Sequence, residues 1–392
     1  MMMLLQALFG RLPIGWLQLS HTKARLFAAV AGVGFANLLV FMQLGIMGAL
    51  NGSTVVPYTM LDADVLISSQ DATTLTDVGG NVARTRMFQA LGTAGVADAM
   101  PVFIGSLPLN LGHGDSVSLL AFGVDVAKPA FVSQQIAMQL PLLQVENTAL
   151  LDQSARGMPD AALSGLLSGA PYDFEVNGQT LNVVGTIKVG GGFLSDGTLV
   201  MSDQTFLRFF AKRSSGAPNH VLVKTADGVS PEVVMDRLQA KLPSESVKIQ
   251  TFEQAAKADI AYMNTERPTG IIFGFGVIMG IIVGIVIVYQ VLSTDVADHL
   301  REYATLKAMG YGHRFFLGIV FEEALVLAIF GFIPGFFASL GLYAMLRTVA
   351  DLPVEMDVTR AVTVFVGTLV ACTISGAIAT RRLAGADPAD LF

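Results

Sequence analysis

The sequence predicts a membrane protein with four transmembrane α-helices and one large α+β domain between the first helix and the second. Four apolar runs each reach the roughly 20 residues that a helix needs to cross a bilayer. About 220 mostly polar residues separate the first run from the other three. The chain is 53% hydrophobic and 14% charged, against roughly 25% charge in soluble domains. The predicted spans are residues 26–50, 270–292, 315–346 and 361–380, and the large domain is residues 51–269.

Basic residues in the short segments predict the orientation, because Lys and Arg accumulate on the cytoplasmic side of a membrane. The arm of residues 1–25, the loop of residues 293–314 and the tail of residues 381–392 carry Lys and Arg, whereas in the loop of residues 347–360 two Arg are outnumbered by three acidic residues. We therefore expect a multi-pass protein of the bacterial inner membrane, with both termini in the cytoplasm and the large domain in the periplasm. The basic residues are Arg11, Lys23, Arg25, Arg301, Lys307, Arg314, Arg381 and Arg382.

The N-terminal arm is expected to lie as a helix in the lipid headgroup layer. It is apolar but interrupted by Pro13 and Gly15, and Trp16 precedes a basic stretch that begins at His21. That mixture is typical of interfacial helices, so membrane lipid is an expected partner. A cleaved signal peptide is the alternative for residues 26–50, but this run is longer than the roughly 7–15 residues of a signal's apolar core.

The large domain alternates between strand and helix patterns. Segments 64–67, 117–124, 174–184 and 221–223 are rich in β-branched residues and bounded by turn formers, which is typical of strands. Asn177-Gly178 predicts a hairpin turn. Ser230 and Pro231 predict the start of a helix, with Ser as the cap and Pro in the first turn. This mixture indicates an α+β domain.

Several kinds of chemistry lack their sequence signals. Gly190-Gly191-Gly192 is not followed by the Lys-Ser or Lys-Thr of a phosphate loop, and a flexible loop is the simpler interpretation. The histidines show no ligand spacing with one another or with Cys372, so we expect no metal site. The acidic excess is dispersed and offers no basic stripe for nucleic acid. No nucleophile elbow is present, so we expect no catalytic residues in this chain.

A stripe of small residues marks the second span. Gly276, Gly280 and Gly284 recur every four residues and share one helical face. In lipid such a stripe lets two helix backbones approach closely. The stripe can pack against the other spans of the same chain or against a second copy, and the sequence-based hypothesis slightly favours the second copy.

The third span contains two adjacent acidic residues, Glu322 and Glu323. An acidic side chain at the centre of a membrane helix costs about 2.5–3.5 kcal/mol, so the pair is not expected to face lipid. Pairing with Arg301 or Arg314 is the favoured explanation, and a protonation site or substrate contact is the alternative. Pro334 in the same span predicts a kink.

The loop between the second and third spans predicts a short amphipathic helix. Its apolar residues Val296, Leu300, Tyr303 and Leu306 fall on one helical face. Asp295 is the expected cap, and Gly310 is expected to end the helix. Such a helix would lie parallel to the membrane, either as a plain connector on the headgroups or as a docking element.

The same loop resembles the corresponding loop of DevC-type permeases, within the MacB/FtsX/LolCE group of ABC transporter membrane subunits. The resemblance implies that this loop is a coupling helix, which docks into a separate ATPase subunit that binds ATP and Mg. No cofactor is then expected in this chain, which has no phosphate-loop motif of its own. The coupling residues implied are Asp298, His299, Leu300, Arg301, Glu302, Tyr303, Ala304, Thr305, Leu306, Lys307, Met309, Gly310 and Tyr311.

The resemblance also implies an export function with several partners. These are a second copy of the permease, a HlyD-type periplasmic adaptor and a TolC-like outer-membrane duct. Substrate would be taken from the periplasm and extruded by ATP-driven movement of the large domain. Two alternatives share the layout: a lipoprotein-releasing permease, and an FtsX-like regulator that transports nothing and activates a cell-wall hydrolase.

Overall fold

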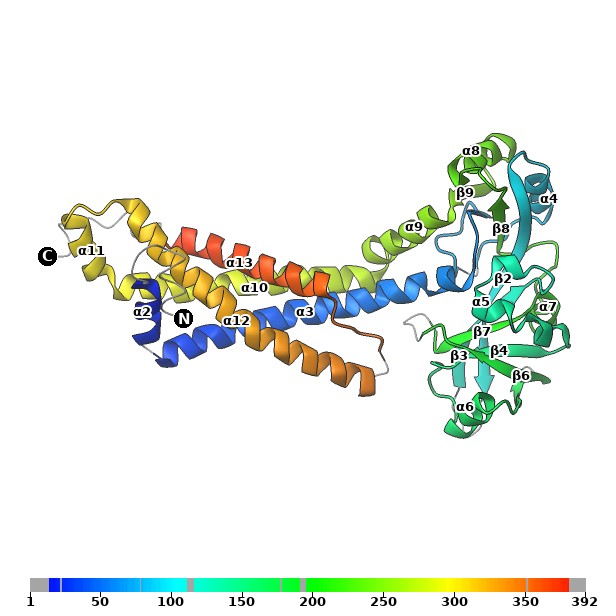
Figure 1. Ribbon diagram of the computed structural model, residues 1–392, viewed down its shortest axis with the longest axis horizontal. Coiled ribbons are helices and arrows are strands. Elements are labelled where there is room, and N and C mark those ends of the chain that lie inside the picture. Colours follow the sequence, from blue (N-terminus) through cyan, green and yellow to red (C-terminus); the bar gives the residue numbers. More distant parts are fainter. Residues whose placement is uncertain are drawn as a thin grey trace. The chain divides into compact units, whose positions relative to one another are not determined.

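The computed structural model describes residues 14–21, 23–77, 79–110, 116–176, 178–190, 195–349 and 352–380 (Figure 1). The chain forms two compact units. A helical unit contains residues 1–48, 271–350 and 354–392, and a sheet unit contains residues 49–270 and 351–353.

Long apolar helices dominate the helical unit. Among the described residues, four helices are long and apolar enough to cross a membrane. The predicted spans fall within them almost completely, and the helices extend past the apolar runs because helical hydrogen bonding does not stop where apolar residues end. These helices are α3 (Lys23–Met60), α10 (Pro268–Asp298), α12 (His313–Val349) and α13 (Val358–Ala379).

Two short helices complete the helical unit. They are α2 (Ile14–His21) in the N-terminal arm and α11 (Leu300–Ala308) in the loop between α10 and α12. Helix α2 packs on α12, and Leu19 is only 3% exposed. The arm is therefore packed on protein along this face, and its place in the headgroup layer stays a prediction.

The sheet unit is built on a nine-stranded mixed sheet with the order β5-β6-β4-β7-β3-β2-β8-β1-β9. The long strand β2 pairs antiparallel with β3 and with β8, so it belongs to both halves of the sheet. The β3–β7 and β4–β6 pairs are parallel. The strands are β1 (Val65–Ser69), β2 (Val96–Asn110), β3 (Ser116–Val124), β4 (Thr148–Asp152), β5 (Tyr172–Val176), β6 (Gln179–Ile187), β7 (Gly197–Ser202), β8 (His220–Thr225) and β9 (Val247–Thr251).

Helices cover this sheet and bury separate apolar clusters on it. One cluster packs α4 and α8 on β1, β8 and β9, and another packs α6 and α7 on β3 to β7. The helices are α4 (Thr85–Leu91), α5 (Gln134–Ala137), α6 (Asp160–Leu167), α7 (Asp203–Phe209), α8 (Pro231–Lys241) and α9 (Phe252–Thr265), with 3-10 turns η1 (Pro129–Phe131) and η2 (Leu140–Gln144).

The predicted local signals agree with these elements. Ser230 caps α8, and its hydroxyl accepts from the Val233 amide at 3.5 Å. Strands β5 and β6 pair with Val176 opposite Gln179, as a two-residue hairpin requires. Gly178 has φ 74°, a conformation that glycine adopts without strain. Asn177 and Gly191-Gly192 lie outside the described residues.

One histidine is fully enclosed in the sheet unit. His220 is 1% exposed; its Nδ1 lies 2.9 Å from Ser68 Oγ, and its Nε2 lies 2.9 Å from the Leu75 carbonyl oxygen. A carbonyl can only accept, so Nε2 donates and Nδ1 accepts from the serine hydroxyl. Burial lowers the pKa of His220 to about 4.

This lowered pKa predicts acid sensitivity of the sheet unit. The unfolded chain binds a proton at His220 near pH 6.5, whereas the folded chain does so only near pH 4. The free energy of unfolding is therefore unaffected by His220 above pH 6.5. As the pH falls toward 4, protonation of the unfolded chain lowers it by about 3 kcal/mol in all. Urea unfolding of the full chain in detergent, followed by β-sheet circular dichroism at pH 7.5 and pH 5, should show the loss. His220→Gln should flatten the dependence of the free energy of unfolding on pH. An unchanged dependence in this variant would contradict the assignment to His220.

The orientation is tested by cysteine labelling. Ser214 in the sheet unit and Thr305 in α11 are both exposed, whereas Ser293 is 4% exposed and unsuitable as a probe. In a Cys372→Ser background, an impermeant thiol reagent on intact cells should label Ser214→Cys. Thr305→Cys should react only after the membrane is opened. Labelling of Thr305→Cys alone would invert the orientation.

Candidate functional site

The candidate site is the place where the loop helix α11 meets the ends of α10, α12 and the N-terminal arm. We call it the coupling junction and define it by Arg25, Asp295, Tyr303, Glu322 and Glu323. Helix α11 is preceded by His299 and followed by Gly310, whose φ of 95° ends it as predicted.

Asp295 does not cap α11, which corrects the sequence-based expectation. Helix α10 continues through Asp298, and Asp295 lies in its last turns with only 2% exposure. The helix breaks at His299, which has φ −96° and ψ 12°. The sequence showed an acidic residue ahead of a helix, but helical hydrogen bonding in α10 persists past it.

The apolar face of α11 packs on the chain's own helices. Tyr303 is 3% exposed, and Leu300 and Leu306 are partly buried against the apolar cluster formed by α3, α10, α12 and α13. The Tyr303 ring meets Phe316 edge-on, with centroids 5.6 Å apart. The opposite face of α11, with Arg301, Glu302 and Thr305, is exposed to solvent. This exposed surface continues into Met309, which is 63% exposed, and Tyr311, which is 45% exposed, both of which follow the helix. Lys307 and Gly310 are exposed as well.

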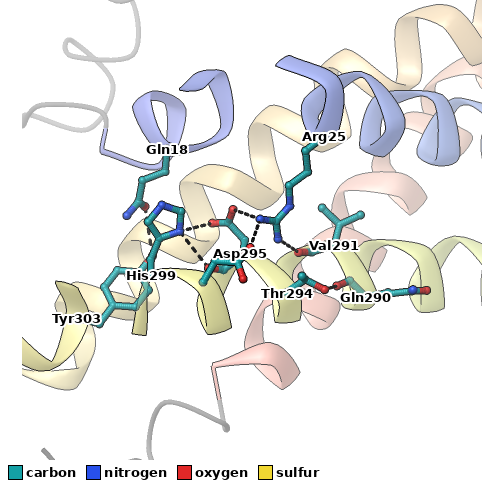
Figure 2. A network of polar contacts seen from close by, with 9 residues as sticks. Gln18, Arg25, Gln290, Val291, Thr294, Asp295, His299 and Tyr303 are labelled. Atoms are coloured by element: carbon teal, nitrogen blue, oxygen red, sulfur yellow. Dashed lines mark hydrogen bonds and ion pairs between the residues drawn. The ribbon is translucent and has the colours of Figure 1, made fainter. Parts of the chain in front are cut away.

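Arg25 ties the start of α3 to the end of α10 (Figure 2). Its Nη1 lies 2.6 Å from Asp298 Oδ2 and 3.5 Å from Asp295 Oδ1, and its Nη2 donates to the Val291 carbonyl at 3.3 Å. His299 Nδ1 lies 3.0 Å from the Asp295 carbonyl oxygen. The guanidinium compensates a carboxylate that is otherwise shielded from water, which makes this pair a structural requirement.

Tyr303 links α11 to the arm. Its hydroxyl donates to Gln18 Oε1 at 3.2 Å, as Figure 2 shows. Burial raises the pKa of Tyr303 far above its ordinary value, and the nearby carboxyl groups of Glu323 and Asp295 raise it further. The hydroxyl therefore stays protonated and keeps its donor role at physiological pH.

Glu322 and Glu323 are fully buried beneath α2. The backbone amide of Trp16, in the first turn of α2, donates to Glu322 Oε1 at 3.2 Å. The amino end of a helix carries partial positive charge and unpaired amide groups, so this placement stabilises a carboxylate. A Cβ on Gly15 would lie 2.9 Å from Glu323 Cγ, so the arm can approach this closely only with glycine there.

Among the described residues, Arg25 is the cation that acts on Glu323 in this cluster. The sequence favoured pairing of the two glutamates with Arg301 or Arg314, but both of those side chains are exposed. Glu323 instead lies beside Asp295 and within the electrostatic reach of Arg25. The expectation is corrected because Arg25 enters from α3, a contact between distant parts of the sequence.

The glycine stripe packs α10 against α3 of the same chain. A Cβ at Gly280 would lie 2.8 Å from Val40 Cγ2, and one at Gly284 would lie 3.3 Å from Ala36 Cβ. A Cβ at Gly276 would collide with the Gln43 side chain. These glycines therefore pack as the intramolecular alternative requires, and a seam with a second copy stays a prediction.

A family model described as FtsX-like permease C-terminal matches residues 274–388. The matched segment includes α11 and most of the coupling junction. Over this segment the chain is similar to the C-terminal part of FtsX-like permeases. No curated protein sequence matches the chain.

Solved structures similar to the permease have low identity. The periplasmic region of MacB from Actinobacillus actinomycetemcomitans is 12% identical, with 51% of this chain and 94% of that chain covered and a TM-score of 0.34. The extracellular domain of the noncanonic ABC-type transporter YknZ from Gram-positive bacteria is 12% identical, with 48% and 98% covered and a TM-score of 0.34. A permease protein domain from Porphyromonas gingivalis is 15% identical, with 49% and 88% covered and a TM-score of 0.30.

Sequence reasoning missed Arg25 and the arm as parts of this site. Arg25 entered only as an indicator of orientation, Trp16 only as an interfacial residue, and Gln18 not at all. A usable signal was present, because a basic residue at the start of one span and acidic residues at the end of the next can meet on the same side of the membrane.

The junction predicts a charge-pair effect on stability. Arg25→Gln should destabilise the permease by about 2 kcal/mol, below the 3–5 kcal/mol of a fully buried pair, because a quarter of the Arg25 side chain is exposed. Adding Asp295→Asn should restore most of the loss, since the uncompensated charge disappears. Thermal unfolding in detergent measures both, with the exposed Arg301→Gln as the control. If the stability losses of the two substitutions simply add in the double variant, Arg25 and Asp295 do not form a direct pair.

Proposed function

We propose that this permease is the membrane subunit of an ABC exporter, in which α11 receives ATP-driven motion from a separate ATPase subunit. One observation carries the proposal: α11 is firmly packed on one face and exposed on the other. The packed face holds Tyr303, Leu300 and Leu306, and the exposed face presents Met309 and Tyr311.

This division suits a force-transmitting element. Close-packed side chains do not deform continuously, so a push on the exposed face moves α11 together with the helices behind it. Through Tyr303 and Gln18 the push reaches α2. Through the last turn of α10 and Arg25 it reaches α3. A plain connector would require none of these contacts.

The proposal includes the partners that the loop's resemblance implies. The ATPase binds ATP and Mg, two copies of the permease pair with two ATPase subunits, and the termini lie in the cytoplasm. A HlyD-type adaptor and a TolC-like duct carry substrate outward from the periplasm. Movement of the large domain by the first two spans drives this export.

Docking of the ATPase is tested at Met309. Leu306 is a poor position, because it is partly buried within the permease and a charge there would disturb the permease itself. Met309→Asp places a charge on the exposed face and should lower ATPase copurification about tenfold or more, if that face becomes buried in the partner. Met309→Leu keeps an apolar side chain and should retain binding. Equal recovery with Met309→Asp and intact transport would make α11 only a connector.

Two other functions share this architecture and are separable by their partners. A lipoprotein-releasing permease would copurify with a release partner, and a regulator of a cell-wall hydrolase would copurify with that hydrolase. Crosslinking of the full chain in native membranes followed by affinity purification distinguishes them. Recovery of a HlyD-type adaptor supports the exporter, and recovery of a hydrolase without an adaptor would overturn it.

A further inference from the structure

A cavity of about 200 Å³ lies between α3, α10 and α13, within the part of the helical unit that crosses the membrane. Its lining is mostly aliphatic side chains and glycine. On α3 the lining residues extend from Val33 to Leu44, about 16 Å at 1.5 Å per residue. The cavity is therefore elongated along the helices, a form that suits an alkyl chain better than a compact ring.

One polar side chain in this wall has an unused hydrogen-bonding group. Asn37 is 5% exposed, and its Nδ2 has no partner among the described residues. Thr368 Oγ1 lies 2.6 Å from Asn37 Oδ1 and 2.7 Å from the Val364 carbonyl oxygen. A hydroxyl has one hydrogen and cannot donate to both acceptors.

One polar atom of the Asn37 amide lacks a hydrogen bond in either orientation of the amide. If Thr368 donates to Oδ1, the amide nitrogen is free. If the amide is reversed and donates to Thr368, its oxygen is free instead. An amide left unpaired in the membrane interior is strongly unfavourable, because no water is present to satisfy it. Asn37 lies near the middle of the apolar run of residues 26–50, far from either headgroup layer.

We propose that this cavity is a binding site for a membrane-soluble alkyl-chain molecule that carries one uncharged hydrogen-bonding group. A fatty alcohol or a protonated fatty acid has this chemistry. The chain would fill the space along α3 and α13, and its hydroxyl or carboxyl group would pair with the free side of Asn37. An uncharged group is required because the site lies deep in the bilayer, where an ion is strongly disfavoured.

Glycines provide matched variants for a test. Gly367 lines the cavity, and a Cβ there meets no atom within 4 Å, so a larger side chain can enter the cavity without displacing a neighbour. Gly341 in α12 has the same open surroundings but does not line the cavity. Gly367→Leu should therefore block the site, and Gly341→Leu should leave it unchanged.

The experiment is photocrosslinking of the full permease in nanodiscs with a diazirine-bearing hexadecanol, compared with the same probe lacking the hydroxyl. In the unmodified permease, the alcohol should label peptides of α3 and α13 that line the cavity. Gly367→Leu should reduce this labelling about tenfold, and Gly341→Leu should not. Asn37→Leu, of similar volume, should reduce labelling by the alcohol about fivefold and leave the alkane probe unaffected.

Several results would overturn the proposal. Equal labelling of the cavity peptides in Gly367→Leu would show that no molecule enters. The alcohol and the alkane could also label the cavity peptides equally, both in the unmodified permease and in Asn37→Leu. That result would show that the cavity is only a gap filled by ordinary lipid chains. If Gly367→Leu does not fold, Ala371→Leu on the same wall replaces it. The labelling is independent of ATPase recruitment, so its outcome does not depend on the proposed coupling by α11.

Discussion

Asp295, Glu322 and Glu323 are buried where α2, α3, α10, α11 and α12 meet, and any of them that is ionised there needs compensation within the protein. Arg25 supplies a cation to Asp295, and the amino end of α2 supplies an amide to Glu322. Each compensating group comes from a segment distant in the sequence. The electrostatic requirement therefore fixes the arm, the first span and the loop helix relative to one another, and the packing of Tyr303 depends on that arrangement.

Close backbone approach provides the second constraint on the helical unit. In lipid, apolar side chains gain little by leaving the solvent, so helices associate through close packing. The glycines of α10 allow this against α3, and Gly15 allows it between the arm and Glu323. Gly280 and Gly284 also line the cavity beside Asn37, which lies between α3, α10 and α13. Helices α3 and α10 thus pack closely at the glycines and also border the cavity.

The sequence predicted those elements whose signals are local. The spans, the Ser230 cap, the hairpin at Gly178 and the amphipathic pattern of α11 all depend on neighbouring residues. The long strand β2 was missed because Pro101 and Pro108 lie within it, and proline normally argues against a paired strand. The cation beside Glu323 and the contact of the glycine stripe with α3 could not be assigned, for another reason. Both depend on which spans are neighbours, and a single sequence does not specify this.

The two faces of α11 are under different physical constraints. Leu300, Tyr303 and Leu306 are fitted to the permease's own helices, so replacing them alters the fold. Residues on the exposed face, such as Met309 and Tyr311, can change without disturbing that packing. Under the proposed coupling, the residues that choose the partner are thereby separate from those that determine the fold. Exchange of the exposed positions alone between two such proteins would then redirect each to the other's ATPase while both keep their structure.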